Sequence, residues 1–526
     1  MAKTNKELSN NLEEFHKRKS FLFDKNRPDA VAKRRAKKQR TARENIDDLC
    51  DKDSFLEVGS LIIAAQRSRK DTNKLIIETP ADGLITGMGS VNSKAFGKTK
   101  SKCIVLSYDY TVLAGTQGAF NHKKTDRLLQ MAKVSRSPIL FFLEGGGGRP
   151  GDVDFDLISN GGLDIKTFVE YARLSGKQPR IAIISGYCFA GNAALAGCSD
   201  VMIATENSSI GMGGPAMIEG GGLGSFHPKD IGPSKLQYQN GVIDILVKDE
   251  AEAVDTAKKY LSYFQGDMKD WQACPQEVLR TLIPEDRRYA YDIFKIINAV
   301  ADTDSVLELR GGFAKNMVTA FLRIEGKAFG LIANSTRHLG GAIDSETSDK
   351  AARFMQLCNS FGIPMISLCD APGFMVGPEC EKTGMARHSS RMFITGARLK
   401  VPLFTVVLRK AYGLGAMAMV GGGLHESYFT VSWPTGEFGA MGLEGAVKLG
   451  FRKEIEDETD PVKKQILNND LVYAAYQKGK AINAASFLEF DEVIDPKDTR
   501  KWISTGLSII DENTYNKGTR NAVDSW

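Results

Sequence analysis

Two short runs of small residues, each directly after an apolar stretch, are the segments of this chain best suited to chemistry. The first run, Gly186–Ala193, follows the apolar Ile181–Ser185, and the second, Arg409–Ala416, follows Leu403–Leu408. A strand that turns straight into a helix leaves backbone N–H groups unpaired at the helix start, where they can hold an anion or a developing oxyanion. Small residues suit such a turn, because a bulky side chain would keep a ligand away from the backbone. The sequence therefore predicts an oxyanion-binding turn at each place.

Side chains that commonly perform acid–base, metal or nucleophilic chemistry are sparse elsewhere. The six histidines form no metal-type pair, and the HExxH, GxSxG and GxxxxGK[ST] patterns are absent, so we expect no metal in this chain. His227 and His388 are predicted to be surface or hydrogen-bonding residues, with a site role as the alternative. Glu144 and Asp370 are predicted to structure loops, with a role as bases as the alternative. Any chemistry then depends on oriented N–H groups, with the reactive group supplied by substrate or cofactor.

The chain contains two diverged copies of one pattern. The stretch from Lys124, KTDRLLQMAKVSRSPILFFLEGGG, resembles the stretch from Lys350, KAARFMQLCNSFGIPMISLCDAPG. Lysine, arginine, glutamine and proline recur at 124/350, 127/353, 130/356 and 138/364, each pair separated by 350 − 124 = 226 positions. SFLEV and SVLEL (from 54 and 305) and KAFG (from 94 and 327) flank these stretches in the same order. We expect two domains, residues 1–275 and 276–526, joined near 274–284.

Each copy predicts the same elements before its turn. A helix leads into an apolar strand that ends in a glycine-bearing loop, and a second helix and strand then lead to the turn. Helices that alternate with buried strands predict an α/β class with largely parallel, layered sheets and right-handed crossovers. The turns also lie at matching positions, which favours a site over a mere tight connection. The helix, strand and loop are Thr125–Val134, Ile139–Leu143 and Glu144–Gly148 in the first copy, and Asp349–Ser360, Met365–Cys369 and Asp370–Gly373 in the second.

Composition indicates an ordinary globular protein and excludes several classes. The chain has 526 residues, 42% of them apolar, a net charge of +5 and 52 glycines, which argues against disorder and coiled coil. Eight cysteines without a CxxC pair are expected to be reduced thiols. The apolar runs are too short for membrane insertion, and the polar, acid-containing first 18 residues do not fit a signal or transit peptide. We expect a cytoplasmic protein, or a mitochondrial matrix protein in a eukaryote.

One basic run stands out between Lys33 and Arg43. Its seven cations lie in a stretch with helical character, and the favoured interpretation is a solvated helix face. A surface for phosphates, such as those of coenzyme A, is the next alternative. A nucleic-acid-binding surface is the weakest alternative, because no aromatic platform and no other basic excess accompany the run.

The residues in and around both turns resemble the carboxyltransferase (beta) subunits of biotin-dependent acyl-CoA carboxylases, which include the propionyl-, methylcrotonyl- and geranyl-CoA carboxylases. The resemblance covers most of the chain, and the order and spacing of its motifs make it specific. The motifs are Thr41–Leu49, Ser54–Glu57, Asp82–Gly87, Asp109–Gly115, Lys350–Phe354, Pro364, Asp370–Phe374, Arg409–Gly413, Trp433–Thr435, Met441-Gly442 and Gly445-Ala446.

This resemblance implies two tandem crotonase-like, βα-layered domains and a site that forms between the first domain of one protomer and the second domain of another. By position, the N–H groups of Gly191 and Asn192 would stabilise a thioester enolate in the acyl-CoA domain. The N–H groups of Leu414 and Gly415 would hold the ureido carbonyl of biotin in the second domain. The residues expected to contact acyl-CoA or biotin around these donors are Ala190, Ala193, Gly146, Gly147, Gly413, Ala416, Met417 and Tyr412.

The resemblance also implies the partners. The chain lacks a biotin-attachment sequence and an ATP-binding half, so biotin would arrive on a separate biotin carboxylase or biotin carrier subunit. A homohexameric core, a trimer of dimers, is expected within a larger complex, and no nucleic acid partner is expected. The predicted activity is transfer of a carboxyl group from carboxybiotin to the α- or vinylogous γ-carbon of an acyl-CoA.

Three departures from the family pattern bear on the site. Asn192 stands where the family usually has a second glycine, and Glu144–Pro150 replaces an SGGAR-like loop. Met417 stands where enzymes for short acyl groups commonly have aspartate, which favours a longer or branched acyl group. Three alternatives stay open: a biotin-dependent decarboxylase that uses the same half-reaction, a non-catalytic CoA-binding scaffold, and a hydratase or isomerase. Of these, the last is weakened because Ala193–Cys198 contains no glutamate.

Overall fold

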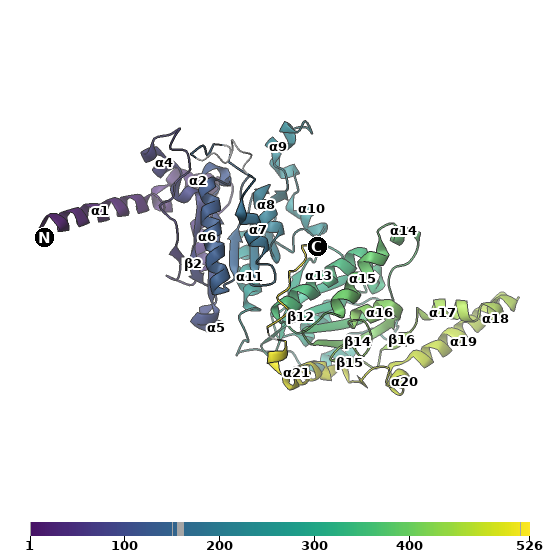
Figure 1. Ribbon diagram of the computed structural model, residues 1–526. Helices are drawn as coiled ribbons and strands as arrows, with labels where there is room; N and C mark the ends of the chain where they lie inside the picture. The colour runs from purple at the N-terminus through teal and green to yellow at the C-terminus, as the bar shows by residue number, and fades with distance from the viewer. Residues whose placement is uncertain (1, 150, 155–162, 516) are drawn as a thin grey trace. The chain divides into compact units, whose positions relative to one another are not determined.

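The computed structural model describes residues 2–149, 151–154, 163–515 and 517–526. The chain packs into two compact units. Unit 1 comprises Met1–Gln265 with Ser525, and unit 2 comprises Gly266–Asp524 with Trp526 (Figure 1). The expected division between 275 and 276 thus lies inside unit 2. The reason is local, because the N–H of Met268 donates to the carbonyl of Gly326 at 3.0 Å and so joins the connecting segment to the second sheet.

Unit 1 is built on a twisted sheet whose described strands run in the order β1-β2-β3-β4-β5-β7-β9. The pairs β1–β2 and β2–β3 are antiparallel, and every later pair is parallel. The central strands β3, β4, β5 and β7 are mostly apolar and almost fully buried, as expected for parallel strands that are covered on both faces. The strands are β1 (Leu56–Glu57), β2 (Leu84–Ser90), β3 (Lys102–Tyr108), β4 (Ile139–Phe142), β5 (Arg180–Ile184), β7 (Val201–Thr205) and β9 (Ile245–Val247), with β6 (Tyr187–Phe189) and β8 (Ser209–Gly211) forming a separate parallel pair.

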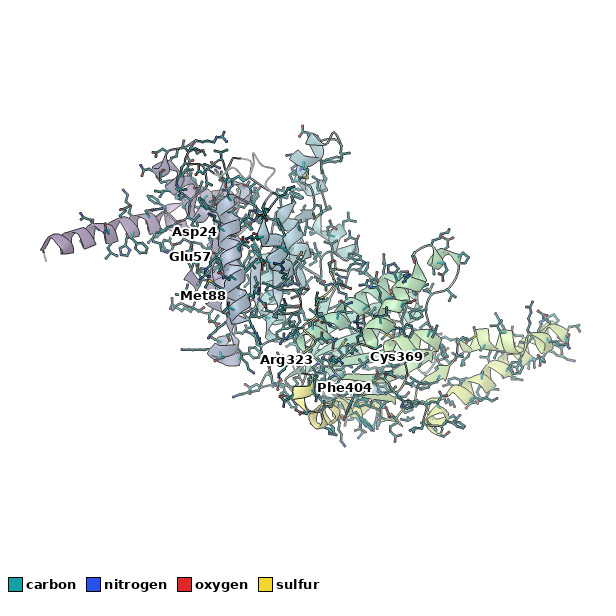
Figure 2. The ribbon with its side chains drawn as sticks, viewed as in Figure 1. Asp24, Glu57, Met88, Arg323, Cys369 and Phe404 are labelled. Carbon is teal, nitrogen blue, oxygen red and sulfur yellow. The ribbon has the colours of Figure 1, made fainter. Side chains whose placement is uncertain are left out.

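Unit 2 repeats this topology with the order β10-β11-β12-β13-β14-β15-β17, and β16 pairs with the end of β14. Its first two pairs are again antiparallel and the rest parallel. Cys369 on β13 and Phe404 on β14, both marked in Figure 2, are fully buried in this sheet. The strands are β10 (Leu307–Leu309), β11 (Met317–Ile324), β12 (Lys327–Asn334), β13 (Met365–Ala371), β14 (Leu403–Tyr412), β15 (Phe429–Ser432), β16 (Glu437–Gly439) and β17 (Glu492–Val493).

Helices connect the strands, and several of them begin at a capping residue. Thr41 and Glu44 form a capping box on α3, and Asp344 caps α13, whose C-terminal end is closed by the left-handed Gly362. In unit 1 the helices are α1 (Ala2–Ser20), α2 (Pro28–Ala36), α3 (Ala42–Leu49), α4 (Thr72–Glu78), α5 (Ser93–Lys100), α6 (Ala119–Ser135), α7 (Lys166–Ala172), α8 (Gly191–Gly197), α9 (Pro215–Gly220), α10 (Ser234–Gln239) and α11 (Glu250–Ser262). In unit 2 they are α12 (Ile293–Val300), α13 (Ser345–Phe361), α14 (Pro378–Glu381), α15 (Met385–Gly396), α16 (Gly413–Met419), α17 (Leu443–Gly450), α18 (Arg452–Asp457), α19 (Pro461–Gly479), α20 (Ala481–Ala485) and α21 (Thr499–Ile509).

The two units share backbone details that confirm the internal repeat. Leu113–Gly115 and Leu339–Gly341 both run through the left-handed region, and their positions differ by 339 − 113 = 226. In each case the last glycine allows close backbone contact. A Cβ on Gly115 would overlap the carbonyl oxygen of Glu144, and a Cβ on Gly341 would lie 2.6 Å from that of Asp370. The same turn therefore packs against the same strand end in both copies.

The predicted helices and strands before the turns are confirmed, with two differences at the turns themselves. The strand predicted to end at Leu408 continues to Tyr412, because its last residues pair with β16 through Lys410 and Glu437. The first turn includes the short strand β6, which pairs with β8. Periodicity within one segment cannot reveal either feature, because both depend on partners that come later in the chain.

Candidate functional site

The first turn lies between β6 and α8 in unit 1 and contains a strained residue. Ala190 has φ 52° and ψ −121°, a conformation that residues with a side chain rarely adopt. Its N–H donates to the carbonyl of Gly211 at 3.1 Å, and its carbonyl accepts from the N–H of Ala194 at 2.9 Å. These two bonds hold the turn between β8 and α8.

The donors that the sequence predicts are present at the start of α8. Within the described residues, no group accepts a hydrogen bond from the N–H of Gly191 or Asn192. Such groups at a helix start have no intrahelical partner. A Cβ on Gly191 would overlap the side-chain oxygen of Gln117, so a larger residue here requires Gln117 or the turn to shift. The turn thus offers two neighbouring backbone donors, as an oxyanion requires.

The side chain of Asn192 is fully occupied by the protein. It is 0% exposed, its Nδ2 donates to the carbonyls of Gly115 (3.2 Å) and Gly146 (3.5 Å), and its Oδ1 accepts from Nε2 of Gln117 at 2.8 Å. The amide therefore neither blocks the turn nor offers a further donor to a ligand. Asn192 can contribute to a site only through its backbone N–H.

The glycine loop after β4 lies against the first turn. A Cβ on Gly147 would lie 2.7 Å from that of Ala190, and Gly146 accepts the bond from Asn192 described above. The described residues of the Glu144–Pro150 loop therefore come together with Ala190–Ala193, as the sequence predicts. Pro150 itself lies outside the described residues.

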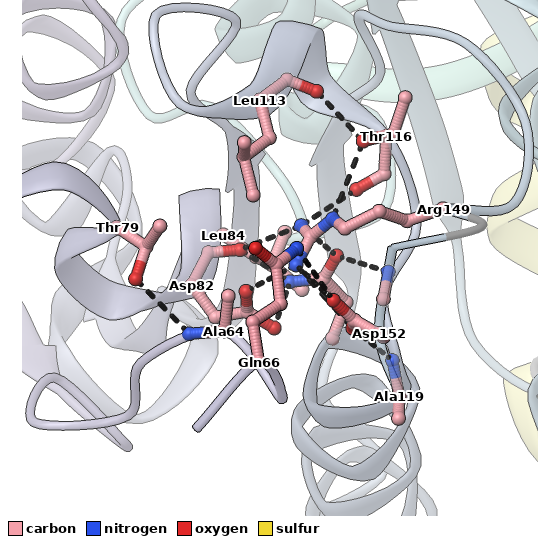
Figure 3. A network of polar contacts seen from close by, with 12 residues as sticks. Ala64, Gln66, Thr79, Asp82, Leu84, Leu113, Thr116, Ala119, Arg149 and Asp152 are labelled. Atoms are coloured by element: carbon pink, nitrogen blue, oxygen red, sulfur yellow. Dashed lines mark hydrogen bonds and ion pairs between the residues drawn. The ribbon is translucent and has the colours of Figure 1, made fainter. Parts of the chain in front are cut away.

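A buried ionic network anchors the far end of this loop (Figure 3). Nη1 of Arg149 lies 2.6 Å from Oδ1 of Asp82, and its Nη2 donates to the carbonyl of Thr116 at 2.9 Å. Asp152 accepts bonds from the N–H of Ala119 (3.0 Å) and from Nε2 of Gln66 (3.1 Å). Burial raises the pKa of Asp82 to about 6, although the charge of Arg149 opposes that shift. Arg149 points into the protein, so this arginine holds the loop and is not available to a ligand.

A second buried cluster supports the near end of the loop. Nη1 of Arg34 donates to both carboxylate oxygens of Glu144 (2.7 and 2.8 Å), and its Nη2 lies 3.3 Å from Glu250. Burial raises the pKa of Glu144 to about 7 against the opposing charge of Arg34, and burial also raises the pKa of Glu250. The prediction of a solvated face for the basic run is therefore wrong for Arg34, which is 4% exposed. Lys33, Lys37 and Lys38 of that run are exposed.

The second turn joins β14 to α16 in unit 2 and has the same form. Gly413 has φ 54°, and it occupies the place of Ala190, since both stand 11 residues after a matching proline (402 and 179). Within the described chain, the N–H groups of Leu414 and Gly415 have no acceptor. A Cβ on Gly415 would lie 2.6 Å from the carbonyl carbon of Gly373, so backbone packs directly on backbone here. A second pair of unpaired donors results.

A cavity of about 570 Å³ lies beside the second turn. This volume is in the range of about 300–1,000 Å³ that is usual for ligand pockets. Met417, 38% exposed, faces it from α16. Apolar and small residues dominate its lining, with Lys478 and Glu489 as the two charged members. The lining residues are Ala411, Gly413, Ala416, Met417, Leu424, Phe438, Gly439, Ala440, Leu443, Ala475, Lys478, Gly479, Ala484, Phe487 and Glu489.

The other predicted residues of this turn have different surroundings. Leu414 is 61% exposed, whereas Tyr412 is buried at the end of β14. Burial raises the pKa of Tyr412, and the nearby charge of Glu437 adds to this effect. Tyr412 therefore supports the turn from the end of β14 and does not line the cavity.

Asp370, the counterpart of Glu144, is also held by a cation. Its Oδ2 accepts from Nε of Arg409 (3.1 Å) and from the hydroxyl of Tyr291 (2.8 Å), and its Oδ1 accepts from the N–H of Lys410 (3.0 Å). The prediction that Glu144 and Asp370 structure loops is confirmed. His388, whose Nδ1 lies 2.7 Å from Asp349, is likewise a hydrogen-bonding residue.

A comparison with protein families decides the class of this protein. The model of the carboxyl transferase domain matches residues 33–522, nearly the whole chain. This chain belongs to the carboxyl transferase family. The relatives that match this chain are carboxyltransferase components of biotin-dependent acyl-CoA carboxylases, which are enzymes. The family resemblance seen in the sequence is therefore confirmed.

Individual relatives agree with this family. The methylmalonyl-CoA carboxyltransferase 12S subunit of Propionibacterium freudenreichii subsp. shermanii is 32% identical, with 91% of this chain and 90% of that protein covered. The biotin-dependent long chain acyl-coenzyme A carboxylase beta4 subunit of Mycobacterium tuberculosis is 29% identical, with 91% and 90% covered.

Solved structures confirm the tandem crotonase-like fold. A single-chain, multi-domain long-chain acyl-CoA carboxylase is 55% identical with a TM-score of 0.90, and the match covers 94% of this chain and 48% of that one. The chain thus spans about half the length of that relative. The transcarboxylase 12S hexamer, with methylmalonyl-coenzyme A bound, is 30% identical with a TM-score of 0.82, and 95% and 94% are covered.

Sequence patterns missed the residues that support the first turn. Gln117 touches the first turn, yet it lies far from Gly186–Ala193 in the chain and belongs to no motif. Arg34 and Arg149 lie in segments that the sequence does single out, but nothing in those segments indicates that the two arginines hold the loop after β4. The described residues contain no cluster of three or more His, Cys, Asp or Glu that could hold a metal ion. They also contain no helix with the length and apolarity needed to cross a bilayer.

Proposed function

We propose that the chain transfers a carboxyl group from carboxybiotin to the α- or vinylogous γ-carbon of an acyl-CoA whose acyl group is long or branched. The observation that carries the choice of substrate is the mostly apolar cavity of about 570 Å³, which Met417 faces beside the second turn. In the site expected between two protomers, a thioester held by the first turn of one protomer would extend its acyl group toward this cavity of the other. A charged residue at position 417 would disfavour an apolar chain, because burying a charge without a partner is costly. The 55% identity to a long-chain acyl-CoA carboxylase supports the same class of substrate.

In this proposal the backbone of the chain does the catalytic work. The N–H groups of Gly191 and Asn192 hold the thioester oxygen while it gains negative charge as an enolate. The N–H groups of Leu414 and Gly415 hold the ureido carbonyl of biotin, and their unpaired state and the absence of side chains at Gly191 and Gly415 fit both roles. When bound, carboxybiotin supplies the carboxyl group and a base for the α-proton. One such donor typically contributes about 2.7–4 kcal/mol to the transition state.

The partners follow from the same proposal. Biotin reaches the chain on a separate biotin carboxylase or biotin carrier subunit, and the chain forms a homohexameric core, as the related 12S subunit does. The second candidate is a decarboxylase that runs the half-reaction in the other direction. The methylmalonyl-CoA decarboxylase subunit alpha of Veillonella parvula is 27% identical, which supports this candidate less than the 55% identity to an acyl-CoA carboxylase supports the first.

The test is carboxylation of a panel of thioesters. The protein is combined with a biotin carboxylase, a biotin carrier, ATP and labelled bicarbonate, and acetyl-, propionyl-, methylcrotonyl- and palmitoyl-CoA are compared. We expect labelled product with the long or branched thioesters and little with acetyl-CoA. A preference for acetyl- or propionyl-CoA would contradict the substrate class, and no product from any thioester would contradict the transferase itself.

A further inference from the structure

Two buried side-chain amides face each other behind the first turn. Nε2 of Gln117 donates to Oδ1 of Asn192 at 2.8 Å, and the two residues are 4% and 0% exposed. The Nδ2 of Asn192 extends the contact to the carbonyls of Gly115 and Gly146. We call this arrangement, Gln117 with Asn192, the amide pair. It links the start of α8 to the segment before α6 and to the loop after β4.

Gln117 is itself fixed at three further points. Its N–H donates to the carbonyl of Gly147 at 3.0 Å, and its carbonyl accepts from the N–H of Arg149 at 2.7 Å. Its side-chain oxygen lies directly over Gly191, where a Cβ would overlap it. Arg149 in turn belongs to the buried network with Asp82. Gln117 therefore connects the buried network of Arg149 to Gly191 and Asn192, the two residues whose N–H groups have no acceptor among the described residues.

The second copy shows what the amide pair replaces. The position equivalent to Gln117 is 117 + 226 = 343, a buried isoleucine, and the position equivalent to Asn192 is Gly415. There, the backbone of Gly373 packs within 2.6 Å of where a Cβ on Gly415 would lie, so the turn rests directly on the neighbouring loop. In the first copy the corresponding space holds the side chain of Asn192, and hydrogen bonds take over the role of backbone packing.

We infer that Gln117 is a positioning residue for the first turn: through Asn192 it fixes the direction of the Gly191 and Asn192 N–H groups. This inference rests on the proposed function, in which those groups hold the thioester oxygen. Gln117 itself does not touch the substrate, because its side-chain amide is engaged with Asn192 and packed on Gly191. Without Gln117, the Oδ1 of Asn192 would be buried with no donor, an arrangement that costs free energy and that the turn can relieve only by moving.

The substitution Gln117→Met tests this role, because methionine keeps the length and volume of glutamine and removes the amide. A misplacement of about 1 Å at a reacting group can cost about 100-fold in rate, so we expect kcat to fall about 10- to 100-fold. KM for the acyl-CoA should stay within about twofold, since the CoA contacts are unchanged. Gln130→Met, at an exposed glutamine of α6, is the matched control and should leave both constants unchanged. An unchanged kcat in Gln117→Met overturns the inference.

A double-variant cycle separates positioning from general damage to the fold. In the Asn192→Gly background, Gln117 has no amide to hold, so adding Gln117→Met should change kcat by less than about threefold. If the loss caused by Gln117→Met is the same in both backgrounds, Gln117 does not act through Asn192 and the inference is wrong.

Hydrogen–deuterium exchange tests the inference without any turnover. Peptides that cover residues 187–197 should exchange faster in Gln117→Met than in the wild type, whereas Gln130→Met should match the wild type. Exchange that is unchanged overturns the inference even if the protein carboxylates no thioester. Faster exchange in a protein without activity would support the amide pair and refute the proposed function, so the two failures are distinguishable.

Discussion

Lys124 on α6 and Lys350 on α13 lie at equivalent positions, and each ammonium group is buried against backbone carbonyls of its own unit. Nζ of Lys124 donates to Ala81 (3.0 Å) and to Leu84, while Nζ of Lys350 donates to Phe313 (2.8 Å) and Met317 (2.7 Å). Burial lowers the pKa of Lys124 to about 8 and that of Lys350 to about 7. A buried lysine at the same position therefore holds the backbone that leads into β2 in unit 1 and into β11 in unit 2.

This role predicts that Lys124→Met destabilises unit 1. The carbonyls of Ala81 and Leu84 would lose a donor in a buried place, and an unsatisfied buried acceptor typically costs about 1–3 kcal/mol. We expect the free energy of unfolding to fall by that amount in denaturant titrations. Lys133→Met, at an exposed lysine of the same helix, should change it by less than about 0.5 kcal/mol. Equal effects of the two substitutions would show that the buried contacts contribute nothing.

The strained Ala190 predicts a stabilising substitution. A residue with a side chain costs about 1–3 kcal/mol in a sparsely populated conformation with positive φ, and glycine avoids most of this cost. We expect Ala190→Gly to raise the free energy of unfolding by about 1 kcal/mol. Gly413→Ala, at the equivalent place in unit 2, should have the opposite sign, because its Cβ would also lie 2.6 Å from the carbonyl oxygen of Ala440. A destabilising Ala190→Gly would mean that the Ala190 methyl group contributes more than the strain costs.

The cluster around Arg34 predicts a fall in stability as the pH rises. One guanidinium faces two carboxylates, and the pKa of Glu144 is raised to about 7 while that of Glu250 is also raised. Between these pKa values the folded state keeps protons on the two carboxylates that the unfolded chain has released. The contribution of the cluster to the free energy of unfolding is therefore full below the ordinary glutamate pKa of about 4.3 and is lost as the pH rises through about 7.

Glu250→Gln measures this contribution directly. It leaves one carboxylate for Arg34, so it should lower the pKa of Glu144 and flatten the dependence of unfolding free energy on pH between about 4.5 and 7. Denaturant titrations of wild type and variant over this range give the comparison. Parallel curves would place the pH dependence elsewhere in the protein.

The cavity beside the second turn predicts a change of substrate in Met417→Asp. A carboxylate at the mouth of a mostly apolar pocket disfavours an apolar chain, because the charge must stay hydrated. We expect kcat/KM to fall at least about tenfold for palmitoyl-CoA and to change less for propionyl-CoA, since about 1.4 kcal/mol corresponds to a factor of ten. Met417→Leu, which keeps the pocket apolar, is the control. Equal losses for both thioesters in Met417→Asp would contradict a role in substrate choice.

The donors of the first turn predict a loss of rate in Gly191→Ala. The added Cβ would overlap the side-chain oxygen of Gln117, so either the turn shifts or Gln117 releases Asn192, and in both cases a donor is misdirected. Loss of one oxyanion donor typically lowers kcat about 100- to 1,000-fold. Gly197→Ala, at a glycine of α8 whose added Cβ would meet open space, is the control and should retain activity. Comparable activity of the two variants would exclude the first turn as the oxyanion site.

Local patterns sufficed for the elements and for the place of the two turns. The apolar runs 139–143 and 365–369, the helices before them and the 226-residue spacing all follow from periodicity and repetition along the chain. Small residues after a buried strand also locate the turns, because tight strand–helix connections require them. These features depend on neighbours a few residues apart, which a single sequence displays.

Tertiary packing alone decided which side chains support the site. Arg34 looks like one cation of a solvated run, yet it is buried between Glu144 and Glu250, which are distant in the chain. Asn192 looks like a departure that could block or extend the turn, yet its amide is buried and held by Gln117 and by the carbonyls of Gly115 and Gly146. The backbone turn is encoded locally because glycine and alanine determine which φ and ψ are accessible, whereas a partner across the fold exists only after the sheet has brought both segments together.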